Sequence, residues 1–408
     1  MGRLLLLIPT TTYRTHDFMR AANALEVDVV VGSDRQQALE HLAPGKTLAL
    51  DFNDLQAAVE EITAFAARFP LEAVLGVDDD TVVLASMASE ALGLPHNSVE
   101  SVRSTRYKHL MRSKLAKTSL PSPGFRLFSV AANSEEAAGA AAYPCVLKPV
   151  SLSASRGVIR ANDQSEFIVA FERIAALIAN EEDKGGEEGD QILVEDYIPG
   201  GEVALEGLLV EGELKVLALF DKPDPLEGPF FEETVYVTPS RLPLSLQRKI
   251  EETTDEAAQA IGLRAGPVHA ELRFNDQGVW VVEIAARSIG GLCSRILKFG
   301  AGISLEELIL RQVLGVDLED LARERSAAGV MMLPVPRKGT LRSVFGQEAA
   351  MKVEGIQGVE FTIPLDQDVE PLPEGDKYLG FMFAKAGTPE EVEAALREAH
   401  RRLGVLIE

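Results

Sequence analysis

Glu271 and Glu283 are the residues whose placement most directly suggests chemistry. Each lies in a stretch where polar and apolar residues alternate, as in a half-buried strand, and the turn sequence Asn275-Asp-Gln-Gly278 separates the two stretches. If the loop has three residues and Gly278 is left-handed, Glu271 lies opposite Glu283 on one face of a sheet. Two facing carboxylates repel each other unless a cation or a shared proton lies between them. The pair is therefore a candidate site for a cation or for acid–base chemistry.

Three interpretations of this pair compete. The first is a solvated sheet face, which is the common meaning of polar residues on a strand. The second is an acid–base pair of the glycosidase type, which needs a sugar cleft lined by aromatic residues, whereas the chain has 1 Trp and 6 Tyr. The third is a Mg²⁺ site, because Mg²⁺ takes oxygen ligands and bridges to phosphates, and neighbouring Arg287 supplies a cation for a bound anion. The hairpin alone does not decide among them.

Lys148 ends an apolar stretch and precedes a loop rich in small residues, Ser151–Gly157. A buried strand rarely carries a lysine unless its ammonium group has a partner. The backbone N–H groups and hydroxyls of the loop, among them Ser151, Ser153 and Ser155, can approach phosphate oxygens. An ordinary interface lysine before a plain loop is the alternative. The chain contains neither a P-loop nor a G-x-G-x-x-G sequence.

A third segment is an apolar strand that breaks into a stretch with one proline and two glycines, within residues 192–202. An irregular backbone of this kind presents N–H and C=O groups to the edge of a nucleobase, and an acid beyond it can accept ribose hydroxyls. A strand-ending turn is the more frequent meaning of such a segment taken alone. The candidate nucleotide contacts here are Glu195, Asp196, Tyr197, Ile198 and Glu202.

In this order and spacing, the three segments resemble the ATP-grasp superfamily of ligases, and the resemblance spans the whole chain. It implies a lysine on the helix entering the central domain, a strand lysine with its loop, a hinge acid, a ribose acid and two metal acids. The matching positions, in that order, are Lys108, Lys148, Glu195, Glu202, Glu271 and Glu283.

Within the superfamily, the chain is similar to the bacterial L-amino acid ligases. The motifs that carry this similarity are Tyr13-Arg14, Asp221–Pro229, Glu232-Glu233, Val268–Glu271 and Glu283–Gly291. The similarity implies a further nucleotide contact at Lys222. Ala285 stands where many ATP-grasp enzymes have an Asn that completes the shell of a second Mg²⁺, and the phosphate loop is rich in Ser where Gly is common. The implied cofactors are therefore ATP and one or two Mg²⁺ ions, with Mn²⁺ as an alternative ion.

The chemistry that the resemblance implies is activation of a carboxylate by ATP. The carboxylate attacks the γ-phosphorus to give an acyl phosphate and ADP, and an amine then displaces phosphate to form an amide, as in a dipeptide. Arg287 would orient the carboxylate or stabilise the oxyanion, and Gly290 and Gly291 would let a substrate approach the backbone. His269 would contact substrate or act as a base, with a structural histidine as the alternative. The competing reaction is of the biotin-carboxylase type, with bicarbonate as the carboxylate, or another activation with a non-amino-acid acceptor.

The elements that must position these residues change character along the chain. Strands at 4–8, 27–31 and 73–77 alternate with helices at 16–25, 55–69 and 81–92, which predicts parallel βαβ units. Ligands are expected at the loops that follow such strands, at 10–14 and 77–80. A basic helix from about residue 101 to 120 leads into short strands, and the polar, Gly-rich segment Asn180–Asp190 is expected to be a mobile loop.

The fold class implied by the resemblance is α/β, an ATP-grasp fold with three domains. Residues 1–100 would form a Rossmann-like N-terminal domain and residues 101–329 the ATP-grasp domain, with a lid at about 122–190. Residues 330–408 would form a strand-rich α+β C-terminal domain.

Composition limits the partners and the compartment. The 408 residues carry a formal net charge of −23, which disfavours nucleic acids and anionic membranes as partners but does not exclude a small anion in a basic pocket. The 2 cysteines, Cys145 and Cys293, are too few for a disulfide framework, so a reducing cytoplasm is expected. The apolar run at 4–8 is too short to cross a bilayer. The expected partners are amino acids, and the resemblance implies a homodimer.

Overall fold

The computed structural model describes residues 2–35, 45–181, 186–318 and 320–408. The N-terminal domain contains a parallel sheet in the order β3-β2-β1-β4, which confirms the expected βαβ units. Its strands are β1 (Arg3–Leu7), β2 (Asp28–Ser33), β3 (Thr47–Ala49) and β4 (Ala73–Gly76). Its helices are α1 (Thr15–Ala24), α2 (Leu55–Arg68) and α3 (Asp79–Leu92).

The basic segment that follows forms two helices, so the single helix expected there is wrong. Helix α4 (Val99–Arg106) ends at Tyr107, whose backbone is extended, with φ −108° and ψ 106°. Helix α5 (Lys108–Leu115) begins at the next residue. The break turns the chain immediately before Lys108, and it places that lysine in the first turn of a new helix, facing the central domain.

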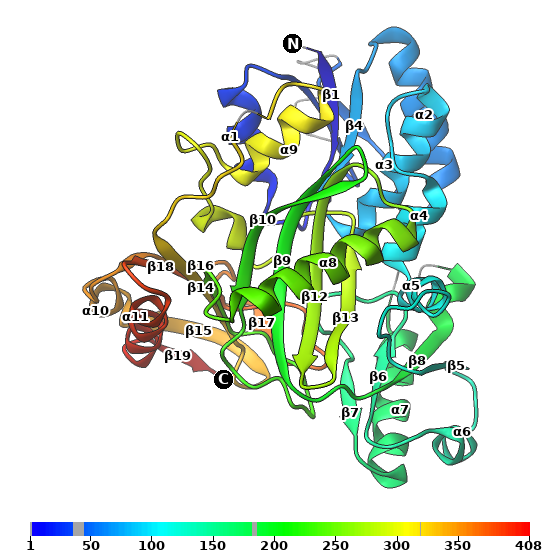
Figure 1. Cartoon of the computed structure of the whole chain (residues 1–408), viewed down its shortest axis with the longest axis vertical. Helices are drawn as coiled ribbons and strands as arrows, with labels where there is room; N and C mark the ends of the chain where they lie inside the picture. Colours follow the sequence, from blue (N-terminus) through cyan, green and yellow to red (C-terminus); the bar gives the residue numbers. More distant parts are fainter. Residues whose placement is uncertain (1, 36–44, 182–185, 319) are drawn as a thin grey trace.

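The lid is a small sheet covered by one long helix. The strands run in the order β5-β8-β6-β7, with β5 (Phe125–Ser129), β6 (Cys145–Pro149), β7 (Ile159–Ala161) and β8 (Gln191–Asp196). Helices α6 (Ser134–Ala140) and α7 (Gln164–Ala179) belong to the same unit, which lies at the lower right of Figure 1. Because β8 pairs with β5 and β6, the lid extends past the expected end at residue 190. Residues 186–190, expected in a mobile loop, form the 3₁₀ helix η2 (Gly186–Asp190), and 182–185 lie outside the described residues.

A larger sheet of eight strands joins the central and C-terminal parts of the molecule, while β15 (Gly339–Phe345), β17 (Asp368–Val369) and β19 (Gly404–Ile407) form a separate three-stranded sheet. The order of the larger sheet is β13-β12-β9-β10-β11-β14-β18-β16. The first five strands are β9 (Gly201–Val210), β10 (Glu213–Asp221), β11 (Val235–Thr238), β12 (Gly266–Asn275) and β13 (Gly278–Ala285). Helix α8 (Leu244–Ile261) crosses one face of these strands, as Figure 1 shows, and packs the apolar side chains of Ile250, Ala257 and Ile261 against them.

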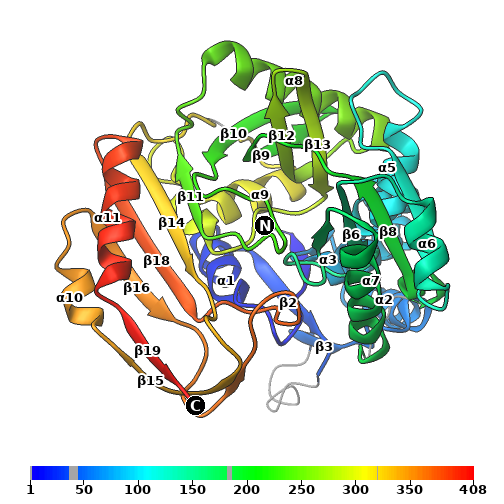
Figure 2. The same cartoon turned by 90° about the horizontal axis from the view of Figure 1, so that it is seen from below.

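The C-terminal strands continue the same sheet. Strands β14 (Ala327–Leu333), β16 (Ile356–Phe361) and β18 (Gly380–Ala386) form its far end, so the expected domain boundary at 329/330 falls inside β14. Figure 2 shows α11 (Pro389–Arg401) lying along these strands, on the other side of the molecule from the lid helix α7. The remaining elements are η3 (Cys293–Ile296), α9 (Leu305–Val313) and α10 (Gln347–Met351).

Local signals set the ends of several helices. Helices α9 and α11 begin with capping boxes, Ser304 with Glu307 and Thr388 with Glu391, and α11 also has Pro389 in its first turn. No helix in the described part of the chain is long and apolar enough to cross a membrane.

Candidate active site

Glu271 and Glu283 lie directly opposite each other on β12 and β13, as expected, but a different local geometry brings them there. Asn275 pairs with Gly278, so the turn has two residues and Gly278 belongs to the strand. This turn by itself would place Glu271 opposite Val282. A β-bulge next to Glu271 restores the pairing with Glu283. The expected three-residue loop is therefore wrong, while the register that it was meant to explain is correct.

The side chain of Arg112 stabilises this β-bulge through hydrogen bonds to the backbone. Its guanidinium is fully buried and donates to the carbonyl oxygens of Val281 (2.7 Å) and Val282 (2.8 Å). It also pairs with Glu195, Nε to Oε1 at 2.5 Å. One buried cation thus links the hairpin of the two facing glutamates to the strand that ends the lid.

The carboxylates around Glu271 form a group that fits a hard cation. Glu202, Glu233 and Glu271 each place an oxygen within 4.8 Å of the other two. Mg²⁺ prefers such oxygen-only ligands. The ammonium of Lys222 lies among the same oxygens, at 2.8 Å from Glu202, 2.5 Å from Glu233 and 3.2 Å from Glu271. Burial lowers the pKa of Lys222, but the three carboxylates outweigh it and hold that pKa well above its usual value.

Lys108 occupies the corresponding place beside Glu283. Its Nζ lies 3.9 Å from Glu283 Oε2 and donates to the carbonyl oxygen of Leu152 in the phosphate loop at 2.6 Å. Burial lowers the pKa of Lys108, and the neighbouring cations Lys148 and Arg106 lower it further, against the opposing effect of Glu283. An ammonium in such surroundings is stabilised by any anion that enters, which suits a phosphate contact.

Lys148 has the partner that its buried position requires. Its Nζ lies 2.7 Å from Glu195 Oε2, and Glu195 is 3% exposed between Lys148 and Arg112. Burial raises the pKa of Glu195, but the two cations outweigh it and lower that pKa to about 2. The Glu195 carboxylate is therefore anchored in an ion pair at the wall of the cavity.

The loop between β6 and β7 contains three residues with left-handed backbone conformations. Ala154 and Ser155 have positive φ, both 56°, and Gly157 has φ 69°. Ser153 and Ser155 line the cavity beside Lys148, whereas the side chain of Ser151 is buried and its carbonyl accepts from Arg106. Successive backbone N–H groups in such turns can converge on an anion.

The segment after Glu195 is held by backbone and side-chain contacts. Asp196 accepts from the Gly124 amide at 3.0 Å, and the Tyr197 amide donates to the Pro144 carbonyl at 3.1 Å. The Tyr197 ring lies near the guanidinium groups of Arg160 and Arg273, at 4.0 and 5.2 Å from its centroid. Asp196 thus holds the lid together, and Tyr197 joins the lid to the central domain.

A first cavity brings most of the expected nucleotide contacts together. Its apolar wall includes Val146, Ile198, Leu226 and Phe231. The expected residues that line it are Lys108, Lys148, Ser153, Ser155, Glu195, Asp196, Tyr197, Ile198, Glu202, Glu271 and Glu283. Ser151 and Lys222 lie behind this lining, the former under Arg106 and the latter among the carboxylates.

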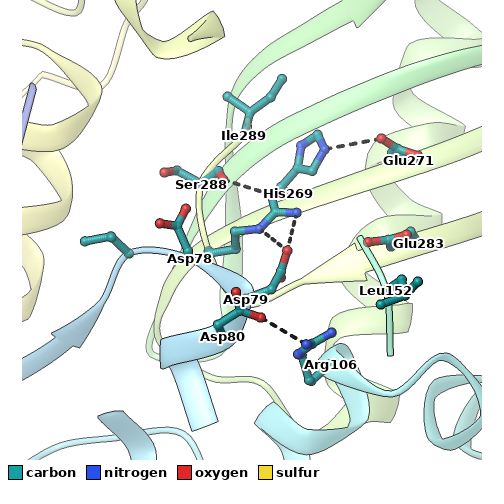
Figure 3. A network of polar contacts seen from close by, with 12 residues as sticks. Asp78, Asp79, Asp80, Arg106, Leu152, His269, Glu271, Glu283, Ser288 and Ile289 are labelled. Carbon is teal, nitrogen blue, oxygen red and sulfur yellow. Dashed lines mark hydrogen bonds and ion pairs between the residues drawn. The ribbon is translucent and has the colours of Figure 1, made fainter. Parts of the chain in front are cut away.

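Arg287 lies on the other side of the facing glutamates and is paired with the N-terminal domain. Its guanidinium contacts Asp79 at 2.9 Å (Nε) and 2.8 Å (Nη2). Figure 3 shows Asp79 next to Asp80, which pairs with Arg106. Burial raises the pKa of Asp79, but Arg287 and then Arg106 and Arg14 outweigh it and lower that pKa to about 2. Arg14, after β1, reinforces the junction because it donates to the Val77 carbonyl and to both the hydroxyl and the carbonyl of Ser288.

The two glycines and His269 complete this side. The Gly291 amide donates to the hydroxyl of Tyr13 at 2.8 Å, and a Cβ at Gly291, where φ is 59°, would lie 2.7 Å from the Met332 sulfur. A larger residue there would be strained at this positive φ and would require the Met332 side chain to move. His269 is buried, with Nε2 3.6 Å from Glu271 Oε1. The expected substrate residues His269, Arg287, Gly290 and Gly291 thus share one wall.

That wall belongs to a second cavity of about 840 Å³ between the three domains. The N-terminal domain contributes Tyr13, Arg14 and Asp78–Asp80, from the two loops that were expected to meet ligands. The C-terminal domain contributes Tyr378 and Phe381. Glu271 and Glu283 line both cavities, as do Ser153, Ser155 and Glu233, so the two cavities meet at the facing glutamates.

Three residues of this arrangement were not anticipated as site residues. Glu233 and Asp79 lie next to sequence features that had been noted, the Glu232-Glu233 pair and the loop at 77–80. Arg112 carried no signal beyond its place in a basic helix. Asp79 and Arg112 act through partners that are distant in sequence, Arg287 lying 208 residues after Asp79 and Glu195 lying 83 residues after Arg112.

Comparison with known proteins shows which families this chain resembles. Residues 141–296 match the family model of the ATP-grasp domain, residues 19–96 that of the ATP-grasp N-terminal domain, and residues 331–408 that of the L-amino acid ligase C-terminal domain 2. Dapdiamide A synthase from Enterobacter agglomerans is 26% identical, over 74% of this chain and 72% of that protein. Alanine–anticapsin ligase from Bacillus subtilis is 29% identical, over 62% of this chain and 56% of that protein.

A solved structure is similar along the whole length. The L-amino acid ligase from Bacillus licheniformis superposes with a TM-score of 0.85 at 26% identity, covering 100% of this chain and 99% of that one. The similarity thus extends beyond the central domain to the two domains that line the larger cavity.

Proposed function

Because the chain is an ATP-grasp ligase that forms C–N bonds and is related to the L-amino acid ligases, we propose that it joins two amino acids into a dipeptide through an acyl phosphate. ATP is converted to ADP and phosphate in this reaction. The observation that supports the proposal best is the meeting of the two cavities at Glu271 and Glu283. A nucleotide on one side of this wall presents its γ-phosphate to a carboxylate on the other.

In the first half of the reaction, the cationic side chains at this wall would bind the phosphates and the substrate carboxylate. Lys108 and Lys148 would hold the phosphates, together with the backbone of the loop around Ser153 and Ser155. Arg287, oriented by Asp79, would hold the amino-acid carboxylate near the γ-phosphorus. A carboxylate oxygen attacks the phosphorus in line, the bond to the β–γ bridging oxygen breaks, and ADP leaves.

The second half takes place in the larger cavity. The amine of the second amino acid attacks the acyl carbon, phosphate leaves, and the nitrogen loses its proton. His269 would accept that proton, and Arg287 would stabilise the oxyanion that forms on the carbonyl oxygen. The lid would exclude water, which otherwise hydrolyses an acyl phosphate.

Glu271 and Glu283, which pair directly across β12 and β13, would hold one Mg²⁺, and the ion would neutralise phosphate charge during transfer. Lys222 already balances part of the negative charge of Glu202 and Glu233. Ala285 is buried opposite His269 and offers no oxygen ligand from its side chain. We therefore expect the chain to use one ion.

Phosphate release measured against mixtures of amino acids tests the proposal. ATP and Mg²⁺ are kept constant, amino acids are added singly and in pairs, and the products are identified by mass spectrometry. We expect phosphate release that needs amino acids and a product with the mass of a dipeptide. Release that needs bicarbonate and biotin, and is insensitive to amino acids, would contradict the proposal.

A further inference from the structure

Glu206 is a buried carboxylate that the reaction described above does not use. It lies in the middle of β9 with 0% of its surface exposed. Its Oε2 accepts from the amide of Ile289 at 2.9 Å. Its Oε1 has no hydrogen-bond partner among the residues that the structure describes. Glu206 therefore differs from Glu195, which is equally buried but has Lys148 and Arg112 in direct contact.

A carboxylate in this position is costly for the fold. Burial of a charged group without full pairing destabilises a protein, and buried polar atoms without partners are rare in folded chains. An apolar residue of similar size would fill the same space in the sheet without this cost. The carboxylate must therefore contribute something other than stability, and its neighbours indicate what this is.

The first neighbour is His269. The two residues lie directly opposite each other on β9 and β12, and His269 Nδ1 lies 3.6 Å from Glu206 Oε2. Nδ1 also has no hydrogen-bond partner within the described part of the chain. At 3.6 Å the two atoms are in ion-pair contact, slightly beyond hydrogen-bond distance. The opposite side of the ring, Nε2, faces Glu271 and the larger cavity.

The second neighbour is the loop that carries the substrate residues. Ile289 lies between Arg287 and the glycines Gly290 and Gly291, and its amide is held by Glu206. The loop is fixed from the other side by Arg14 and Tyr13 of the N-terminal domain. Glu206 itself does not line either cavity described above, so it acts through these neighbours.

We propose that Glu206 is the positioning residue of the amino-acid half of the site, because one buried carboxylate orients both the His269 ring and the Ile289 amide. This inference rests on the proposed function. It assigns to Glu206 no contact with substrate, nucleotide or metal. Its loss should impair the use of amino acids and leave ATP binding intact.

Three variants separate positioning from stability. In Glu206→Leu, both contacts are removed and no charge remains buried, so the fold should be retained. We expect kcat to fall at least ~10-fold and the KM for the amino acids to rise, with the KM for ATP unchanged. In Glu206→Gln, an acceptor for the Ile289 amide remains, so part of the loss should be recovered. Glu306→Leu, which replaces a buried glutamate of α9 that lines neither cavity, is the matched control.

A spectroscopic measurement reports on the contact itself. With ¹⁵N-labelled histidine, the ring nitrogens of His269 are identified as the signals lost in His269→Asn. We expect Glu206→Leu to shift those signals and Glu306→Leu to leave them in place. Glu206→Leu with wild-type kcat, amino-acid KM and His269 signals would overturn the inference. If Glu206→Leu does not fold, Glu206→Gln decides by the same three readouts.

The inference and the proposed function fail in different ways. A wild-type protein that releases no phosphate in response to amino acids contradicts the proposed function. A wild-type protein that does respond, together with a Glu206→Gln variant identical to it in kinetics and in the His269 signals, contradicts only the role of Glu206.

Discussion

The guanidinium of Arg287 and the carboxylate of Asp79 form a partly buried ion pair across 208 residues of sequence, with Nη2 and Oδ2 2.8 Å apart. Arg287 belongs to the loop after β13, and Asp79 begins helix α3 of the N-terminal domain. The cation that we assign to the substrate carboxylate is thus held in place by a residue of a different domain.

Removal of the Asp79 charge should release Arg287. In Asp79→Asn, we expect kcat/KM for the carboxylate substrate to fall by roughly 100-fold, the cost of displacing a reacting group by about 1 Å. The KM for ATP should change little, because Asp79 does not line the nucleotide cavity. Steady-state kinetics with each substrate varied in turn measures both. Glu90→Gln, an exposed change on the same helix, should behave like the wild type. An Asp79→Asn enzyme with normal kcat/KM would show that Arg287 needs no such partner.

Loss of the proposed Mg²⁺ ligand Glu283 should stop turnover, as should removal of the ion itself. In Glu283→Ala, the pair of facing carboxylates loses one member, so we expect no detectable phosphate release and no Mg²⁺-dependent tightening of ATP binding. Isothermal titration with ATP, with and without Mg²⁺, measures the second effect. Asp276→Asn, in the exposed turn of the same hairpin, is the control. Chelation of the ion should abolish activity, and Mn²⁺ should restore it. Near-normal turnover in Glu283→Ala would refute the assignment of the metal.

Protonation of Glu195 at acidic pH should lower the free energy of unfolding. Its pKa is about 2 in the folded chain against an ordinary 4.5, so the folded state binds the proton less readily than the unfolded state. The ion pair therefore stabilises the fold fully above pH 4.5 and loses this contribution as the pH falls from about 4.5 toward 2.

The variant Glu195→Gln tests this at neutral pH. It leaves Arg112 and Lys148 buried without their carboxylate, so the free energy of unfolding should fall by about 3–5 kcal/mol. Urea unfolding at pH 7, 5, 4 and 3 should show the difference from the wild type shrinking below pH 4.5. Glu213→Gln, which removes an exposed partner of Lys215, should cost far less at every pH. A difference that stays constant down to pH 3 would contradict the low pKa.

The lid is fastened to the C-terminal domain, and loosening it should uncouple the reaction. Arg173 of α7 pairs with Glu374, and the Gly157 amide of the phosphate loop donates to the Pro373 carbonyl at 2.9 Å. The same C-terminal segment carries Tyr378 into the larger cavity. An exposed ion pair adds little stability, so Glu374→Gln should leave the melting temperature nearly unchanged.

We expect Glu374→Gln to release phosphate without forming an equivalent amount of amide, because water reaches the acyl phosphate when the lid closes poorly. The measurement is amide formed per phosphate released, by mass spectrometry and a phosphate assay on the same sample. Glu398→Gln, which breaks exposed pairs of α11 with Arg401 and Arg402, is the control. An unchanged ratio of amide to phosphate in Glu374→Gln would show that the ion pair between Arg173 and Glu374 plays no part in lid closure.

The sequence by itself determined much of this protein, because many of its signals are local. Alternation of polar and apolar residues identified β12 and β13, and the order of Lys148, Glu195, Glu271 and Glu283 indicated an ATP-grasp ligase before any contact was known. The parallel βαβ units and the loops at 10–14 and 77–80 also follow from local pattern, since the carboxyl ends of parallel strands meet at one edge.

Only the tertiary structure decided how those residues are held. The bulge that places Glu271 opposite Glu283 depends on Arg112, which comes from a helix more than 160 residues earlier. The partners of Arg287, Lys222 and His269 also lie on other strands or domains. Ion pairs and bulges of this kind depend on which elements pack together, and burial then sets their strength. Local pattern carries no record of either, so the facing glutamates were visible in the sequence and the groups that orient them were not.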